Sequence, residues 1–156
     1  MKLRESILIP ATADQVWAPI IDPRFWTEWN PKVRAIHRDR TGPLVAGETF
    51  PAEFELGGQM TPARIETVAL DPNQRLVLHQ HYDQDGRSRL LEIIFELEPK
   101  ETAVRLTQII DFRHTGVPWL FQLLIVGIHR FGRPSGKASL EDLRARFLPA
   151  SLPEQT

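Results

Sequence analysis

The middle of the chain alternates apolar and polar residues with the period of two that a half-buried β-strand requires. In FPAEFEL, at 50–56, the phenylalanines share one face and the glutamates share the other. LLEIIFELE at 90–98 and AVRLTQIIDF at 103–112 follow the same scheme. Each of these segments is therefore predicted to be a strand with one face against a core. The residues predicted to point inward are Phe50, Ala52, Phe54, Leu56, Leu91, Ile93, Phe95, Leu97, Val104, Leu106, Gln108, Ile110 and Phe112.

Weaker patterns predict four more strands, at 2–9, 32–39, 62–70 and 74–82. Turn-forming sequences such as GG, DPNQ and DQDG separate several of them, and such sequences favour tight connections between neighbouring strands. The chain therefore predicts one strand at its start and six more in antiparallel succession from about residue 32.

Two short helices are predicted between the first strand and the rest of the sheet. Thr12 is a suitable N-cap for a helix through ATADQVWAPII, whose apolar residues form one stripe. Asp22 followed by Pro23 favours a second start, because proline is tolerated at the first helical position. In this second helix, PRFWTEWN, Trp26 and Trp29 share a face. Aromatic surface is thus concentrated where the helices must meet the sheet.

The C-terminal part, from 117 to about 147, is predicted to be a long helix with a kink or break near 132–136, where Pro134 removes a hydrogen bond. Such a helix is the one predicted element long enough to cover the apolar face of the sheet. A curved sheet wrapped around one helix leaves space between them, so we expect a hydrophobic cavity. The helix residues expected on the broad apolar face are Leu120, Phe121, Leu124, Ile125, Ile128 and Phe131.

Composition bounds the class of protein. With 156 residues and 42% hydrophobic residues, the chain predicts a single domain over 1–149, followed by a flexible tail over 150–156. Nineteen basic residues balance twenty acidic ones, so no broad positive field favours nucleic acid. The apolar run at 117–128 is too short to span a bilayer, and the start lacks the core of a signal peptide. We therefore expect no transmembrane segment and a cytoplasmic location.

The order of elements and one stretch of sequence carry a family resemblance. ILIPATADQVWAPIIDPRFWTEWNPKV resembles the START-like superfamily, also called SRPBCC or birch-pollen-allergen-like, and within it the bacterial polyketide cyclase/dehydrase type. The resemblance covers nearly the whole chain and implies an α+β helix-grip fold, in which a curved seven-stranded antiparallel sheet wraps around a long C-terminal helix. Because that superfamily includes lipid carriers, receptors and cyclases, the resemblance implies no single activity. The matching residues are Ile9, Pro10, Ala11, Val16, Trp17, Asp22, Trp26, Trp29 and Pro31.

Polar residues at inward positions indicate where a ligand would be oriented. Gln80, Tyr82 and Gln108 lie on strands that otherwise face a core, and a buried polar group needs a partner. They either bond to one another or to water, or they line a pocket and contact a mostly apolar ligand. The predicted ligand-binding residues are Trp29, Phe50, Phe54, Leu78, Gln80, Tyr82, Ile93, Phe95, Gln108, Ile110, Phe112, Phe121, Leu124, Ile125 and Ile128.

The histidines are the other candidates for a catalytic or metal-binding role. Alternation after Val33 turns His37 inward unless a bulge reverses it, whereas His79 and His81 are expected to face solvent. Two histidines two positions apart can hold zinc, but no third ligand lies at a familiar sequence spacing, so no metal site is predicted. No nucleotide-binding glycine motif is present, so no cofactor is expected. The charged residues expected on the solvated face are Arg64, Glu66, Arg87, Arg89, Glu92, Glu96 and Glu98.

The leading hypothesis is a domain that binds a small hydrophobic or amphipathic molecule, lipid-like or polyketide-like, in an internal cavity. The alternative is a polyketide cyclase/aromatase or dehydratase-type enzyme in which His37, Tyr82 and Gln108 assist proton transfer. A third hypothesis is a protein-interaction module, in which the apolar C-terminal helix contacts a partner or a second copy in a homodimer. The sequence leaves open whether the protein is an enzyme.

Overall fold

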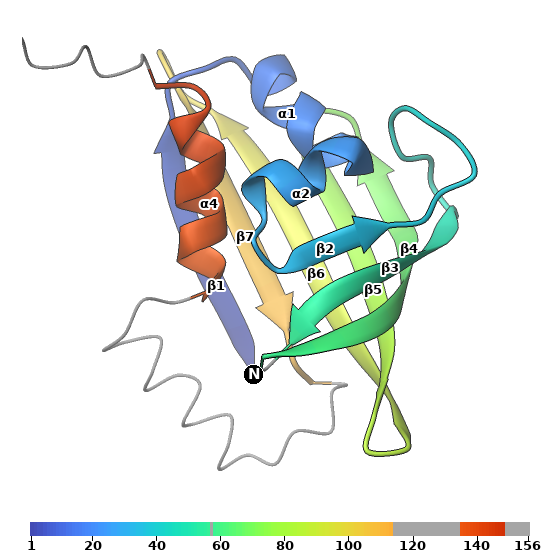
Figure 1. Cartoon of the computed structure of the whole chain (residues 1–156). Helices are drawn as coiled ribbons and strands as arrows, with labels where there is room; N and C mark the ends of the chain where they lie inside the picture. Colours follow the sequence, from blue (N-terminus) through green and yellow to red (C-terminus); the bar gives the residue numbers. More distant parts are fainter. Residues whose placement is uncertain (57, 114–134, 149–156) are drawn as a thin grey trace, which may run out of the picture.

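A computed structural model describes residues 1–56, 58–113 and 135–148 of the chain. Seven antiparallel strands form one sheet in the order β1-β7-β6-β5-β4-β3-β2, and the helices lie across one face of it (Figure 1). The strands are β1 (Lys2–Ile9), β2 (Val33–Ile36), β3 (Thr49–Leu56), β4 (Gln59–Asp71), β5 (Arg75–Gln84), β6 (Arg87–Pro99) and β7 (Val104–Asp111). The helices are α1 (Ala13–Ile21), the 3₁₀ helix η1 (Pro23–Phe25), α2 (Trp26–Trp29) and α4 (Ser135–Ala145).

Sequential hairpins build most of the sheet, and the N-terminal strand then completes it beside the last one. β1 pairs with β7 so that Ile7 faces Leu106 across the ladder. The turn between β5 and β6 is Asp85–Gly86, and both residues have positive φ, at 53° and 69°, as a two-residue hairpin turn requires. All seven predicted strands are present, although β4 and β6 extend further than the alternation predicts, to 13 residues each.

Two irregularities interrupt the regular pairing of the strands. The register shifts between Thr67 and Ala69 where β4 pairs with β5, and between Val33 and Ala35 where β2 pairs with β3. An extra residue in one strand bends it and increases the local twist. The shift in β2 also changes the face to which the residues after it point.

The tryptophans of α2 donate hydrogen bonds to carbonyl groups at the C-terminal end of α1. Thr12 and Gln15 form a capping box at the start of α1, as the predicted N-cap requires. At its other end, the last carbonyls have no partner within the helix. Two of them accept hydrogen bonds from indole N–H groups and a third accepts from a loop. These pairs are Trp29 Nε1 to the Pro19 oxygen at 3.0 Å, Trp26 Nε1 to the Ile20 oxygen at 2.8 Å, and the Leu44 amide to the Ile21 oxygen at 2.8 Å.

Two buried aspartates each bind an arginine two positions later in the chain. Burial alone would raise the pKa of Asp22, but hydrogen bonds from the side chain and backbone of Arg24 hold it below its ordinary value. Burial opposes ionisation of Asp111 in the same way, yet Arg113, at 2.7 Å, and the more distant Lys2 lower its pKa to about 2. These pairs fix the chain just after α1 and at the end of β7.

The C-terminal helix is described only in part. α4 buries Leu140 and Leu143 and packs against β1 and α2 (Figure 1). Arg146, just after it, forms an ion pair with Glu28 at 2.5 Å. The sheet and these helices fit the predicted helix-grip architecture, but the single long helix over 117–147 is not confirmed. Residues 114–134, which include most of the predicted kink or break at 132–136, and the tail at 150–156 lie outside the described residues.

Candidate functional site

Side chains from α2 and six strands converge on a small cavity between α2 and the inner face of the sheet. Its volume is about 30 Å³. Trp29 closes it from the helix side and meets the ring of Phe95 edge-on, with the ring centroids 6.1 Å apart. The lining residues are Trp26, Trp29, Asn30, Val33, Phe54, Ile65, Leu78, Ile93, Phe95 and Gln108.

This cavity is far smaller than a ligand needs. A volume of about 30 Å³ accommodates roughly one water molecule, whereas pockets for small molecules begin near ~300 Å³. A cavity large enough for a guest is therefore not confirmed by the part of the chain that the structure describes. Larger depressions, of about 410 and 310 Å³, lie elsewhere, one between the start of α1 and the β6–β7 turn and one between η1 and residues 36–41.

Three buried polar side chains face this apolar interior with unsatisfied atoms. Gln80 is 1% exposed, and Thr67 and Gln108 are also buried. Among the described residues, no hydrogen-bond partner is present for Nε2 of Gln80, Oγ1 of Thr67 or Oε1 of Gln108. Leaving such a group unpaired costs about 1–3 kcal/mol. Gln80 lies directly opposite Ile65 in the ladder, so it adjoins the lining of the cavity.

Tyr82 and Arg89 lie further along the same face. They are opposite each other in the β5–β6 ladder, so the half-buried Arg89 shares the inward face with Tyr82. Burial raises the pKa of the Tyr82 phenol, and the positive charge of Arg89 offsets part of that effect. The expectation that Arg89 faces solvent is therefore wrong. The alternation that turns Leu91 and Ile93 inward extends back to Arg89 without interruption.

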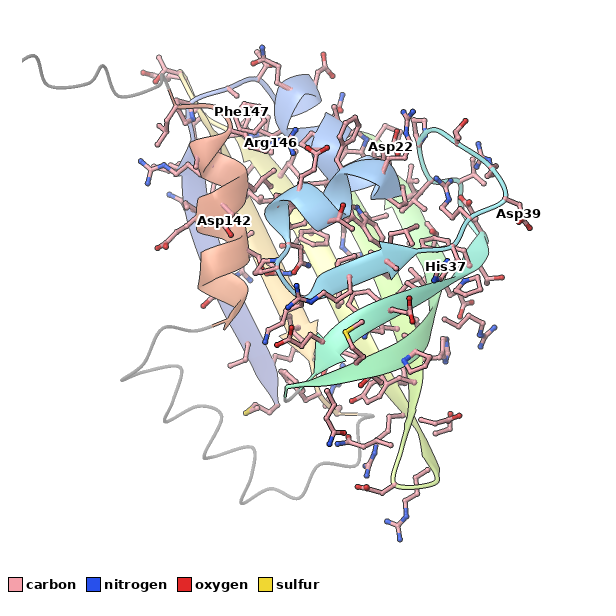
Figure 2. The ribbon with its side chains drawn as sticks, in the orientation of Figure 1. Asp22, His37, Asp39, Asp142, Arg146 and Phe147 are labelled. Atoms are coloured by element: carbon pink, nitrogen blue, oxygen red, sulfur yellow. The ribbon has the colours of Figure 1, made fainter. Side chains whose placement is uncertain are left out.

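His37 points outward, which is the orientation expected where a bulge interrupts the alternation of β2. His37 follows β2 at the edge of the sheet, its side chain is 58% exposed, and its Nε2 lies 3.1 Å from a carboxylate oxygen of Glu53 (Figure 2). The register shift between Val33 and Ala35 reverses the alternation on which the prediction depended. His37 is thus removed from the candidate catalytic residues.

The remaining predicted site residues divide into two groups. Phe50 is buried against Trp26 in the core, with the ring centroids 6.0 Å apart, while Ile110 and Phe112 are half-buried toward the far end of β7. The other group consists of Phe121, Leu124, Ile125 and Ile128, which lie outside the described residues. Sequence reasoning missed Thr67, although it occupies an inward position, two residues after Ile65, that alternation along β4 would have indicated.

The opposite face of the sheet carries His79 and His81, as predicted, but they are not simply solvated. Nε2 of His81 lies 3.0 Å from a carboxylate oxygen of Glu66, and Nε2 of His79 lies 3.0 Å from one of Glu92. The hydrogen bond with His81 lowers the pKa of Glu66 below its ordinary value. The four side chains come from three neighbouring strands, β4, β5 and β6.

Comparison with known proteins identifies solved structures with a similar fold. No curated protein matches the sequence. Among solved structures, the protein CV1439 from Chromobacterium violaceum has a TM-score of 0.70 at 18% identity, covering 95% of this chain and 97% of that one. A conserved protein from Geobacillus kaustophilus has a TM-score of 0.70 at 14% identity, over 94% and 95% of the two chains. These likenesses establish the fold alone.

DynU16, a protein encoded in the dynemicin biosynthetic locus, has a TM-score of 0.63 at 22% identity. The alignment covers 99% of this chain and 49% of DynU16, so this chain spans about half of it. Within the described residues, no helix is long and apolar enough to cross a membrane. The model of the family described as polyketide cyclase/dehydrase and lipid transport matches residues 1–147, and the chain therefore belongs to this family.

Proposed function

We propose that the domain binds a small, mostly apolar molecule on the inner face of the sheet, with its few polar groups paired to Gln80 and Gln108. The family and the fold suggest a ligand-binding or cyclase-type role without naming a substrate. The observation that supports binding is the pair of buried amide atoms that lack partners within the described residues, on a face that is otherwise apolar. A ligand with a hydrogen-bond acceptor and a donor would satisfy both.

The binding space extends beyond the cavity beside Trp29. From that cavity, the inward residues run along β5 from Leu78 to Gln80 and Tyr82, and along β6 from Ile93 to Arg89. A ligand lying along this track would meet apolar side chains first and the polar groups of Tyr82 and Arg89 last. An amphipathic molecule with its polar end toward Tyr82 matches this order.

Burial of apolar surface provides enough free energy for such binding. Removing ~200 Å² of ligand surface from water contributes roughly 5 kcal/mol before the costs of association. Part of the unfavourable cost of the unpaired amides is also recovered when the ligand bonds to them. No metal or covalent chemistry is needed for binding at this face.

A second candidate function is cyclase-type catalysis with Tyr82 as the proton donor. The phenol of Tyr82 is protonated at neutral pH and can donate a proton, and Arg89 opposite it would stabilise an oxyanion on a bound carbonyl compound. Gln108 would position the substrate in this case. Tyr82→Phe distinguishes the two functions, because it would leave binding nearly unchanged but abolish turnover of the bound molecule.

Identification of a co-purifying molecule tests the proposal most directly. The protein purified from its own host would be examined by native mass spectrometry, and the proposal predicts a bound species of mostly apolar character. In parallel, the purified chain would be titrated with 1-anilinonaphthalene-8-sulfonate, an amphipathic fluorophore. Gln80→Leu and Gln108→Leu should change its affinity severalfold, and the exposed Gln84→Leu on the same strand should not. Equal affinity in all variants would contradict binding at this face.

A further inference from the structure

The outer face of the sheet gathers two histidines and two glutamates at its centre. His79 and His81 are two positions apart on β5, so both project to the same face. Glu66 lies directly opposite His79 on β4, and Glu92 lies directly opposite His79 on β6. The sequence separates these residues by up to 26 positions, but the sheet makes them neighbours.

Three of these side chains converge closely enough to share an ion. One ligand atom each from Glu66, His79 and His81 lies within 4.8 Å of the others. The two imidazole rings are 6.1 Å apart between centroids and inclined at 70°, so they do not stack. Ligands around a tetrahedral zinc ion lie ~3.4 Å apart, given Zn–N distances of about 2.0–2.1 Å. Side-chain rotations that move the ligand atoms by roughly an ångström would therefore bring them to the separation that a zinc ion requires.

We propose that Glu66, His79 and His81 bind a divalent transition-metal ion, and that Zn²⁺ is the ion these donors fit best. Two imidazoles and one carboxylate are a borderline-soft donor set of the kind that zinc prefers over calcium or magnesium. Three protein ligands leave a coordination position for water. Glu92, whose oxygen already lies 3.0 Å from Nε2 of His79, orients that imidazole or supplies a fourth ligand atom. The site is independent of the proposed ligand on the inner face.

The surroundings of the cluster suit a bound ion. The side chains of His79 and His81 are 23% and 27% exposed, so an ion can reach them while neighbouring side chains partly shield them from solvent. Val77 and Ile94, both buried, lie beside them on the same face and lower the local polarity. Arg64, opposite His81 in the ladder, is a neighbouring cation that opposes binding, and its exposed side chain can turn toward solvent.

His37 provides a matched control, because it also forms a histidine–glutamate pair. Its Nε2 lies 3.1 Å from Glu53, a geometry close to that of His81 with Glu66, but it does not belong to the metal-ligand group. A single histidine–carboxylate pair does not supply the three ligands of a specific zinc site. His37→Gln and His81→Gln therefore remove the same group from two surface pairs, of which only one belongs to the proposed site.

The test is a calorimetric titration of the full chain, freed of any affinity tag and stripped with a chelator, with zinc chloride. We expect one Zn²⁺ per chain with a dissociation constant in the micromolar range or below. His81→Gln and Glu66→Gln should each weaken binding tenfold or more, whereas His37→Gln should leave it unchanged. Co²⁺ in place of Zn²⁺ should give a visible spectrum that is lost in His81→Gln. Circular dichroism of each variant verifies that it is folded.

Two results would overturn the proposal. One is the absence of saturable binding at one ion per chain in the unaltered protein. The other is equal zinc affinity in the folded His81→Gln and His37→Gln variants, since it would assign any binding to surface groups in general.

Discussion

Replacing Gln80 by methionine tests whether the buried amide on β5 lacks a hydrogen-bond partner in the ligand-free protein. The side chain is 1% exposed, and its Nε2 has no partner among the residues described. Methionine has a similar volume and removes the amide without a large cavity. Because an unpaired buried polar group costs about 1–3 kcal/mol, we expect Gln80→Met to raise the free energy of unfolding of the ligand-free protein by about 1–2 kcal/mol.

Urea denaturation measures this change. With a slope of about 2 kcal/mol per molar urea for a small domain, the midpoint should rise by roughly 0.5–1 M. Gln84→Met, at the exposed end of the same strand, is the control and should change stability by less than ~0.5 kcal/mol. The same Gln80→Met protein should bind 1-anilinonaphthalene-8-sulfonate with altered affinity, so that a gain in stability accompanies a change in binding.

The opposite result would refute the reasoning. If Gln80→Met lowered the free energy of unfolding by more than ~1 kcal/mol, the amide would have a protein partner in the native state. It would then be a structural hydrogen-bonding group, and the main support for a polar contact with a ligand at this position would be lost.

Three further predictions concern stability. Trp29→Phe removes the indole N–H that satisfies the Pro19 carbonyl and part of a buried ring, so thermal or urea unfolding should show a loss of about 2–4 kcal/mol. Leu143→Ala, in the buried face of α4, should cost about 2–5 kcal/mol in the same assay, and a loss under 1 kcal/mol would mean that α4 does not pack on the sheet. Because the pKa of Asp111 falls from 3.8 to about 2, its carboxylate contributes about 2 kcal/mol above pH 3.8, and this is lost as pH falls through 2. Asp111→Asn should abolish that part of the pH dependence of unfolding, the exposed Asp142→Asn should keep it, and identical profiles for the two would contradict the assignment.

The sequence was sufficient to predict the strands because three of them alternate strongly and turn-forming sequences separate several of the others. The capped start of α1 and the proline start of η1 were predictable for the same reason, since Thr12 and Asp22 act within two or three residues of their own positions. What these patterns could not show is the partner of each residue across the sheet. The third ligand atom at His79 and His81 comes from Glu66, which no spacing along the chain connects to a histidine motif.

Errors in orientation arose where alternation was interrupted or applied unevenly. A register shift in β2 turned His37 outward, and no residue in VRAIH signals it. Arg89 is predicted to face solvent together with the other charged residues, but its position two residues before Leu91 places it on the inward face. A long arginine can bury its stem on an apolar face, so charge alone does not decide the orientation of a strand residue.

The hydrogen bonds from Trp26 and Trp29 to α1 have a consequence for how a guest molecule could reach the interior. Passage beside these two rings would detach both indoles from backbone carbonyls that have no alternative donor within the helix, at roughly 1 kcal/mol or more for each. Passage near Tyr82, at the other end of the track, leaves these bonds intact. Trp26 and Trp29 therefore form a fixed wall of the domain, and a guest molecule should enter and leave at the other end, near Tyr82.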